Sequence, residues 1–354
     1  MNKHIEYKVA RIKQKAVIIS LLSTLFCILS TNQIDAASFE LSVSPPIFEI
    51  ELTPPAVADV NEQIILENTG DDGMNLEIDF RLFRPQDKNG DIVYLKKGDL
   101  YGDDPLILKR IRIMDDDKEI HELYLSPHTK KKLNLIITIP KDEPPSDYYF
   151  SILFSSKEDE KQNNGSYTES IGGVAVNTLL SIGPKDSTKG SIEEFSTDFF
   201  RTEGPVPFVV TIHNKSKHFI SPQASIAIRN MFGQTIGKIE LLPVNILSES
   251  SRSLPSKEQF VINAQETDED KKTKKQNATI LKLISHSLTP VAVWPESFLL
   301  GPYSATLTVA LSENGPLYVK TIHFFAFPLH ILIGFIIAIL LLLTIKHRLA
   351  YKKV

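Results

Sequence analysis

The sequence feature that most constrains this chain is an apolar stretch at residues 324–345, FFAFPLHILIGFIIAILLLLTI, which contains no Asp, Glu, Lys or Arg. A bilayer hydrocarbon core of ~30 Å is crossed by ~20 apolar residues in a helix. The stretch therefore predicts a transmembrane helix over residues 324–345. The alternative is a buried core helix, but a soluble core rarely needs a fully apolar run of this length.

The residues on both sides of the stretch predict its orientation. Proline fits the first turn of a helix, so Pro328 predicts the helix start, with Phe324, Phe325 and Phe327 forming an aromatic collar above it. The tail of residues 346–354 carries four basic residues: Lys346, Arg348, Lys352 and Lys353. Under the positive-inside rule this tail is cytoplasmic, and the chain before the helix is extracellular.

The N-terminus predicts export. A basic segment precedes an apolar run at residues 16–30, and Ile34-Asp35-Ala36 is typical of a signal-peptidase site. We expect a signal peptide over residues 1–36, cleaved after Ala36, with an uncleaved signal anchor as the alternative. The single cysteine, Cys27, lies inside the signal peptide, so the mature chain has no disulfide, thiol nucleophile or cysteine-ligated metal.

Charge and length limit the partners and the architecture. The formal net charge is −4 for the whole chain, −7 without residues 1–36, and −11 when the basic tail is also left out. An acidic exported part of this kind excludes nucleic acid as a partner and disfavours anionic lipid surfaces. The exported residues 37–323 are too many for one small sandwich and suit two domains.

Short segments with alternating apolar and polar residues, separated by Pro, Gly, Asn and Asp, predict an all-β chain of two immunoglobulin-like β-sandwiches. The polar link GPKDST at residues 183–188 predicts a first domain over residues 37–185 and a second over residues 190–323. Expected strands of the first domain cover residues 39–43, 47–52, 63–68, 76–82, 133–139, 148–155 and 172–182. Those of the second cover residues 192–196, 208–214, 225–230, 236–241, 260–263, 304–310 and 318–325. Residues 264–276, AQETDEDKKTKKQ, have no apolar side chain beyond Ala264 and predict an exposed or disordered insertion.

The two halves share a sequence pattern that suggests duplication of one fold. In each half an early strand ends in an asparagine, Asn68 and Asn214, followed closely by a hydroxyl residue. Each half also has a tyrosine at the start of its penultimate strand, Tyr148 and Tyr303, where an immunoglobulin-like sandwich has its tyrosine corner.

No catalytic or metal-binding motif is found. The loop containing Asn89-Gly90 has oxygen ligands, but the glycine and closing glutamate of a calcium loop are out of register, so it predicts a tight turn. His213 and His218 form the closest histidine pair and lack a nearby acidic ligand, which favours structural roles. Adjacent carboxylates give no sign of facing each other across a cleft. We therefore predict no enzyme activity, no metal and no cofactor.

Several segments resemble the WxL-interacting cell-surface proteins of Gram-positive bacteria. The hairpin Asn89-Gly90-Asp91-Ile92-Val93-Tyr94 is similar to that family's N-G-x-I-x-Y motif, and Tyr148-Tyr149 resembles its Tyr-Tyr strand. Residues 230–233, 247–252, 301–307 and 324–328 resemble, in order, its N-x-x-G turn, its leucine-proline-glycine-serine stretch ending in arginine, its G-x-Y strand and its aromatic approach to the membrane. The chain departs from the pattern at residues 54–59, at Ser146-Asp147, at Ser248-Glu249 in place of the proline-glycine, and in the insertion 264–276. The resemblance implies a peptidoglycan-binding domain followed by a domain that binds a partner or host protein.

These observations lead to one main functional prediction and two alternatives. The main prediction is a single-pass protein of the cell membrane, whose first domain contacts a cell-wall polymer, with Tyr94 and Tyr101 as glycan-contact candidates, and whose second contacts an exported surface protein. Exposed strand edges are the candidates for protein docking by β-augmentation. The first alternative is an envelope assembly chaperone that caps strands of exported subunits. The second, a hydrolase, lacks a catalytic constellation.

Overall fold

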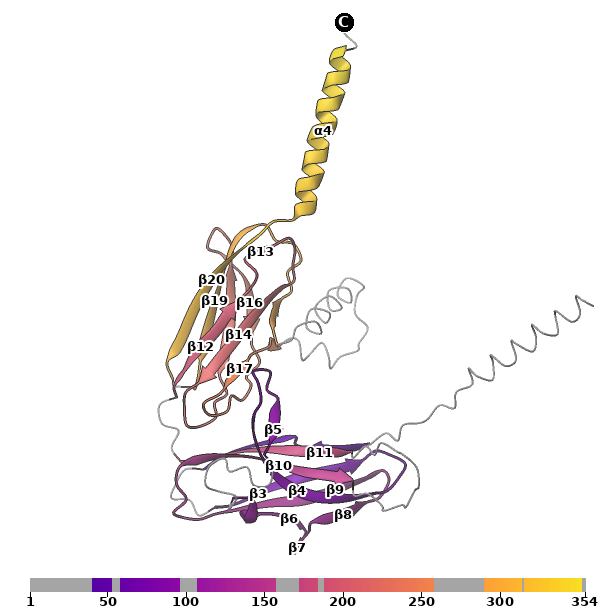
Figure 1. Cartoon of the computed structure of the whole chain (residues 1–354), viewed down its shortest axis with the longest axis vertical. Helices are drawn as coiled ribbons and strands as arrows, with labels where there is room; N and C mark the ends of the chain where they lie inside the picture. Colours follow the sequence, from indigo (N-terminus) through magenta and orange to yellow (C-terminus); the bar gives the residue numbers. More distant parts are fainter. Residues whose placement is uncertain are drawn as a thin grey trace, which may run out of the picture.

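The computed structural model describes residues 40–52, 58–95, 107–156, 172–183, 188–257, 290–313 and 315–351. The predicted signal peptide and its cleavage site, the strand at 260–263 and the insertion at 264–276 lie outside these residues. The described chain is mainly β-structure with one long C-terminal helix, as predicted (Figure 1).

The first unit contains two sheets packed face to face. The first sheet has the order β1 (Leu41–Ser44), β3 (Ala58–Asn68), β9 (Thr129–Ile139), β6 (Ile111–Asp115) and β7 (Lys118–Glu119). The second has the order β2 (Ile47–Leu52), β11 (Gly173–Ile182), β10 (Ser146–Ser156), β4 (Met74–Pro85) and β5 (Ile92–Tyr94), with β8 (Glu122–Leu125) paired to β4. A 3₁₀ turn, η1 (Ile107–Arg110), precedes β6.

Period-two alternation builds the core between these sheets. Leu133, Leu135 and Ile137 of β9 are almost fully buried, and they pack in one cluster with Phe150 and Ile152 of β10 from the opposite sheet. Side chains at every second position of a strand point to the same face, so each sheet supplies one apolar face and the core forms where the two meet.

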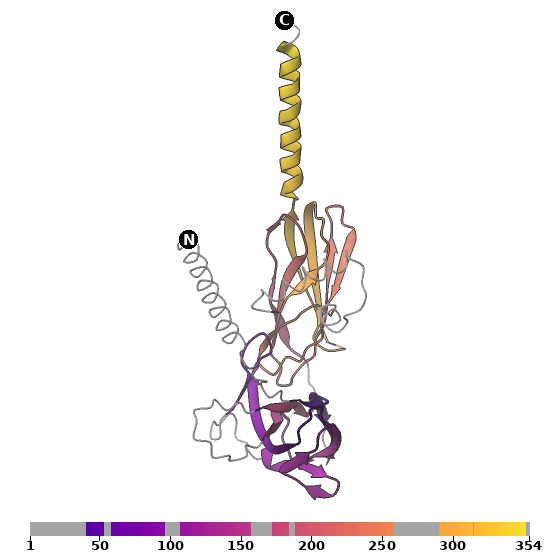
Figure 2. The ribbon, with the colours of Figure 1, turned by 90° about the vertical axis from the view of Figure 1, so that its right-hand side faces the viewer.

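The second unit repeats this two-layer arrangement. One sheet has the order β12 (Gly190–Ser196), β14 (Val206–Asn214) and β17 (Ser251–Ser253), with β18 (Ala292–Trp294) also paired to β14. The other has the order β13 (Phe200–Arg201), β20 (Leu317–Ala326), β19 (Gly301–Ala310), β15 (Gln223–Arg229) and β16 (Thr235–Glu240). Figures 1 and 2 show this unit between the first unit and the C-terminal helix.

The two asparagines of the predicted duplication occupy equivalent positions. Asn68 ends β3, Asn214 ends β14, and both side chains are fully buried. Each side-chain amide donates to three backbone carbonyls, and each side-chain oxygen accepts the amide proton of the residue two positions later. The same short motif therefore closes the loops at one end of each unit.

The C-terminal helix α4 (Leu329–Tyr351) follows β20 after only two residues, Phe327 and Pro328. Within the described chain it is the one helix long and apolar enough to cross a membrane, by its length and a mean hydropathy of 2.6 over residues 329–346, none of which is buried. Lys346 is exposed near the end of this helix, whereas Lys352 and Lys353 lie beyond the described residues and the side chain of Arg348 is not described.

The predicted aromatic collar needs correction. Phe324 is 1% exposed and lies in the core of the second unit, stacked on Tyr303 at 5.2 Å between ring centroids. Phe325 stacks on Phe200, and only Phe327 lies in the link to the helix. Phe324 belongs to β20, where alternation turns its side chain toward the core; an apolar run in the sequence cannot show where a strand ends and a helix begins.

Candidate protein-docking site

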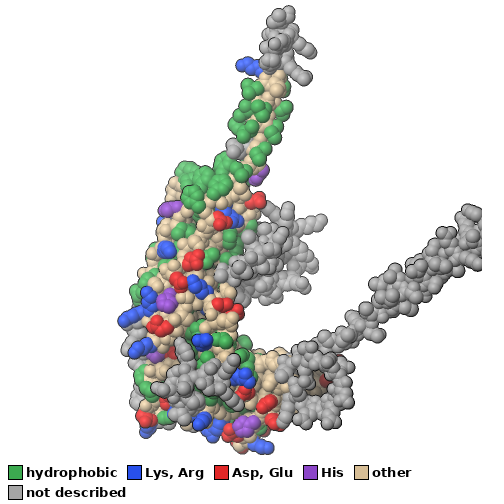
Figure 3. All heavy atoms as spheres, in the orientation of Figure 1, with side chains coloured by type: hydrophobic (Ala, Val, Ile, Leu, Met, Phe, Trp, Pro, Cys, Tyr) green, Lys and Arg blue, Asp and Glu red, His purple; other side chains and the backbone are tan. Residues whose placement is uncertain are grey.

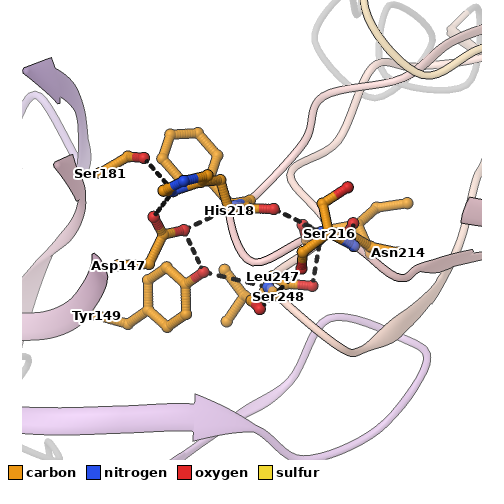
Figure 4. Close-up of polar contacts among 10 residues, drawn as sticks. Asp147, Tyr149, Ser181, Asn214, Ser216, His218, Leu247 and Ser248 are labelled. Atoms are coloured by element: carbon orange, nitrogen blue, oxygen red, sulfur yellow. Dashed lines mark hydrogen bonds and ion pairs between the residues drawn. The ribbon is translucent and has the colours of Figure 1, made fainter. Parts of the chain in front are cut away.

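The two units meet in a buried polar junction centred on Asp147, at the start of β10 (Figure 4). Its carboxylate accepts hydrogen bonds from the backbone amide of Phe219 at 2.6 Å and from the hydroxyl of Tyr149 at 2.6 Å. It also contacts Nδ1 of His218 at 2.7 Å, and that nitrogen lies 2.9 Å from the hydroxyl of Ser181. The His218 side chain is 11% exposed and that of Asp147 is 3% exposed, so the contact is shielded from water.

Tyr149 extends the junction to a second loop of the second unit. The amide of Ser248 donates to the Tyr149 hydroxyl at 3.1 Å while that hydroxyl donates to Asp147. Burial, together with the neighbouring Asp147 carboxylate, raises the pKa of Tyr149 far above its ordinary value. The phenol is therefore neutral and serves as a hydrogen-bonding bridge between the units.

Asn214 holds the two loops that receive these contacts. Its side-chain amide donates to the carbonyls of His218, Ile246 and Leu247 at 2.9–3.1 Å. Asn214 thus holds the loop carrying His218 and the loop carrying Ser248 together, and both loops contact the first unit.

An apolar cluster surrounds the polar contacts. Its buried members come from both units: Phe83, Leu179, Phe219 and Leu247, with Ile92, Tyr94 and Tyr149 packed against them. Tyr94, a predicted glycan-contact residue, is therefore a half-buried part of the contact between the units. Tyr101, the other candidate, lies outside the described residues.

The predicted Asn-Gly turn also joins the units. Gly90 has a φ of +98°, which glycine adopts at little cost, and a Cβ there would lie 2.3 Å from the Arg252 guanidinium of the second unit. The Lys88 carbonyl accepts the amide of Ser253 at 2.7 Å, and the Lys88 ammonium pairs with Glu193. Hydrogen bonds from Lys88 and Ser251 lower the pKa of Glu193. The hairpin between β4 and β5 is thus a second point of attachment.

A cleft of about 960 Å³ opens beside the junction. Its charged lining is mixed: Arg84, Arg110 and Lys217 face a space shared with Asp142, Glu143 and Glu249. Arg110 is paired with Glu143 at 2.6 Å, and Tyr148 donates to the same carboxylate.

The described residues contain no group of three His, Cys, Asp or Glu side chains that could hold a metal ion. His213 and His218 bond to Ser251 and Asp147 and do not approach a common site.

Among the described residues, no strand is hydrogen-bonded to the outer side of β20 along residues 317–324, here called the β20 edge, although β12 of the other sheet lies close to β20. On its inner side β20 pairs with β19 along its whole length, but its other neighbour, β13, pairs only with Phe325 and Ala326. The amides of Phe325 and Phe327 donate toward β13. Because amide directions alternate along a strand, the N–H and C=O groups of Leu317, Val319 and Thr321 point to the same side, where no described strand pairs with them.

The side chains beside this edge are unusually apolar for an exposed strand. Leu317 is 66% exposed and Val319 is 62% exposed, both on the outer face of the sheet. Leu317 also lines a depression of about 500 Å³, whose other lining residues come mainly from β19, β15 and β16, on the side of β20 away from this edge. Within the described chain, the β20 edge therefore combines backbone groups that pair with no strand and exposed apolar side chains.

Comparison with known proteins gives structural likeness only. No family model matches the chain, and no curated protein matches it. The solved structures that it resembles include a class 5 fimbriae chaperone, 9% identical with a TM-score of 0.35, covering 81% of this chain and 99% of that one. They also include the chaperone–tip adhesin complex of CFA/I fimbriae, 8% identical with a TM-score of 0.36, covering 79% and 97%. A third is the CupB2 chaperone of Pseudomonas aeruginosa, 9% identical with a TM-score of 0.31, covering 79% and 98%.

These findings correct the main functional prediction. The chain was predicted to bind a cell-wall polymer, whereas the solved structures that it resembles include chaperones of fimbriae. The side chain of Tyr94, the predicted glycan contact, is half-buried against the apolar cluster between the units. At these TM-scores the likeness does not support a function for this chain. The function proposed below therefore rests on the geometry of the chain itself. The resemblance to WxL-interacting proteins stays a prediction.

Proposed function

We propose that this protein is a membrane-anchored assembly chaperone, without enzyme activity, that holds a strand of an exported protein subunit at the β20 edge. The observation that carries the proposal is the unpaired outer side of residues 317–324, flanked by exposed Leu317 and Val319. An extended segment adding to such an edge gains main-chain hydrogen bonds, and neighbouring hollows select its side chains. Exposed Leu317 and Val319 supply apolar side chains beside the unpaired backbone groups.

Three other edge strands, β2, β12 and β16, are shorter and better protected. β2 carries Glu49 and Glu51, β12 contains a bulge between Ile192 and Glu194, and β16 carries the exposed pair Lys238 and Glu240. Charged residues and bulges are the means by which natural sheets discourage edge pairing. The β20 edge has a single lysine, Lys320, and is the longest of the four.

Three further features support the proposal. Both units have the layer arrangement of immunoglobulin-like sandwiches, which we infer to be their fold class. Hydrogen bonds at Asp147 and Tyr149 join the two units at the junction. We also propose that α4 spans the cell membrane, with both units on the exported side and the basic tail in the cytoplasm.

The test is complementation of a deletion strain, with surface levels of exported proteins measured by quantitative mass spectrometry. Val319→Pro and Thr321→Pro each remove an N–H that points away from β19, so the pairing with β19 is kept. A strand-capping chaperone predicts that deletion lowers the surface level of at least one exported protein and that these variants fail to restore it.

The matched control is Lys238→Pro on β16. Its N–H also faces an open edge, because the amide of Leu241 points to β15 and directions alternate from there. Lys238→Pro should restore the lost protein fully. Unchanged surface levels in the deletion strain would refute the chaperone function, and full rescue by both β20 variants would exclude this edge as the docking site.

A further inference from the structure

The end of the second unit next to α4 carries a group of exposed apolar side chains, here called the apolar tip. Its members are Phe199 (75% exposed), Phe200 (46%), Met231 (53%), Phe232 (77%), Phe298 (56%) and Leu300 (50%). Figure 3 shows hydrophobic side chains gathered where this unit meets the helix. Exposed apolar groups of this kind mark a surface that contacts another phase or molecule.

Strand register places three separate loops at this one end. The first is the β12–β13 segment, because the amide of Phe325 donates to the carbonyl of Phe199 and that of Phe327 to Arg201. The second is the turn between β15 and β16, because a Cβ at Gly301 would lie 2.5 Å from the Met231 side chain, and Gly301 pairs with Ala326.

The third loop is residues 295–300. The amide of Gly204, just after β13, donates to the carbonyl of Ser297 at 3.2 Å, so this loop lies against the first one. Phe298 and Leu300 project from it into solvent. Three loops thus present aromatic and aliphatic side chains around the last residues of β20, two residues before α4 begins.

We infer that the apolar tip seats the second unit in the interfacial layer of the same bilayer that α4 crosses. The inference rests on the proposed membrane span. The link between β20 and α4 has two residues, and its Phe327 amide donates to the Arg201 carbonyl. The link is therefore too short to hold the apolar tip away from the membrane. Phenylalanine, leucine and methionine at loop tips gain free energy by entering the boundary between headgroups and acyl chains.

The charged side chains at this end indicate how deeply the apolar tip enters the bilayer and which lipids it prefers. Glu203 and Glu296 are exposed on the same loops, and Asp198 is paired with Arg201 at 2.6 Å. Carboxylates stay at the level of the headgroups, so the contact is shallow. They also oppose a negative surface, so the seating does not need anionic lipid.

The experiment uses the full-length protein in phosphatidylcholine vesicles with brominated acyl chains, which quench nearby tryptophans. Phe232→Trp and Phe298→Trp place a reporter at the apolar tip, and both positions are exposed enough to take the larger ring. The native Trp294 is buried at 5% exposure and gives the background, measured in the unchanged protein. Tyr124→Trp, at a 62% exposed site in the first unit, is the matched control.

We expect the emission of both tip reporters to shift to the blue and to be quenched by brominated lipid, while Tyr124→Trp stays unquenched. Vesicle flotation of the same samples reports on the α4 anchor separately. If the protein floats with the vesicles but the tip reporters are not quenched, the apolar tip does not enter the bilayer, whereas the α4 anchor is supported. A blue shift without quenching would mean that protein covers the tip, which also overturns it. A chain that does not float would refute the anchor and the seating together.

Discussion

At the scale of single residues, the two buried asparagines show how much local sequence can reveal. Asn68 and Asn214 each end a strand before a hydroxyl residue, and that pattern is visible without coordinates. The role of His218 is not, because its partner Asp147 lies 71 positions earlier in the chain. Sequence proximity pairs His218 with His213, whereas in the fold the two histidines serve different contacts.

Replacing Asn214 should destabilise the second unit strongly. Asn214→Ala removes a side chain that donates to three buried carbonyls, which are then left without these donors. We expect a loss of about 3 kcal/mol in the free energy of unfolding, measured by urea denaturation. Asn75→Ala, at an exposed position of β4, is the control and should cost less than about 0.5 kcal/mol. Equal losses in both variants would contradict the role of Asn214 as a loop anchor.

At the scale of elements, long alternating segments were predictable and short paired ones were not. The expected strands at residues 133–139, 148–155 and 304–310 lie within β9, β10 and β19. β8, β17 and β18 are three or four residues long, too short for a period-two pattern to stand out, and they form because longer strands offer them an edge. The expected strand over residues 318–325 and the expected helix start at Pro328 leave little linker between them, and the two-residue link agrees with this.

The contact between β16 and β18 depends on a glycine. A Cβ at Gly237 would lie 2.5 Å from Nε1 of Trp294, the single tryptophan of the chain. Gly237→Ala should therefore displace the indole and cost about 1–3 kcal/mol. Thermal unfolding and the position of the Trp294 emission maximum report the two effects, with exposed Lys238→Ala as the control. An unshifted emission maximum with unchanged stability would show that the ring is not held against β16.

At the scale of the whole molecule, the contact between the units could not be predicted from the sequence. Asp147 stands at a departure from the resembled family pattern, and Tyr94 was interpreted as a surface residue. Both are explained only by loops of the second unit that reach them across the junction. Edges are equally invisible in a sequence, because alternation identifies a strand without saying whether a neighbour covers it.

The junction should weaken at high pH through Tyr149. Because burial raises the folded-state pKa of this phenol above its ordinary value of 10.0, its stabilising contribution is present below pH 10 and is lost as the pH rises further. Between about pH 9 and about pH 11, the unfolding free energy should fall more steeply for the unchanged protein than for Tyr149→Phe. Tyr124→Phe, at an exposed site, should follow the unchanged protein. Identical pH slopes for the unchanged protein and Tyr149→Phe would refute this role.

The short link formed by Phe327 and Pro328 also determines how force passes between the second unit and α4. Two residues can extend by at most ~7 Å, so a pull on a strand held at the β20 edge reaches α4 almost without slack. The adjoining hydrogen bonds to Phe199 and Arg201 spread that load into a second strand of the same sheet. Under the proposed function, the held strand and the membrane anchor would be connected almost directly, and the strand would be released at the β20 edge itself.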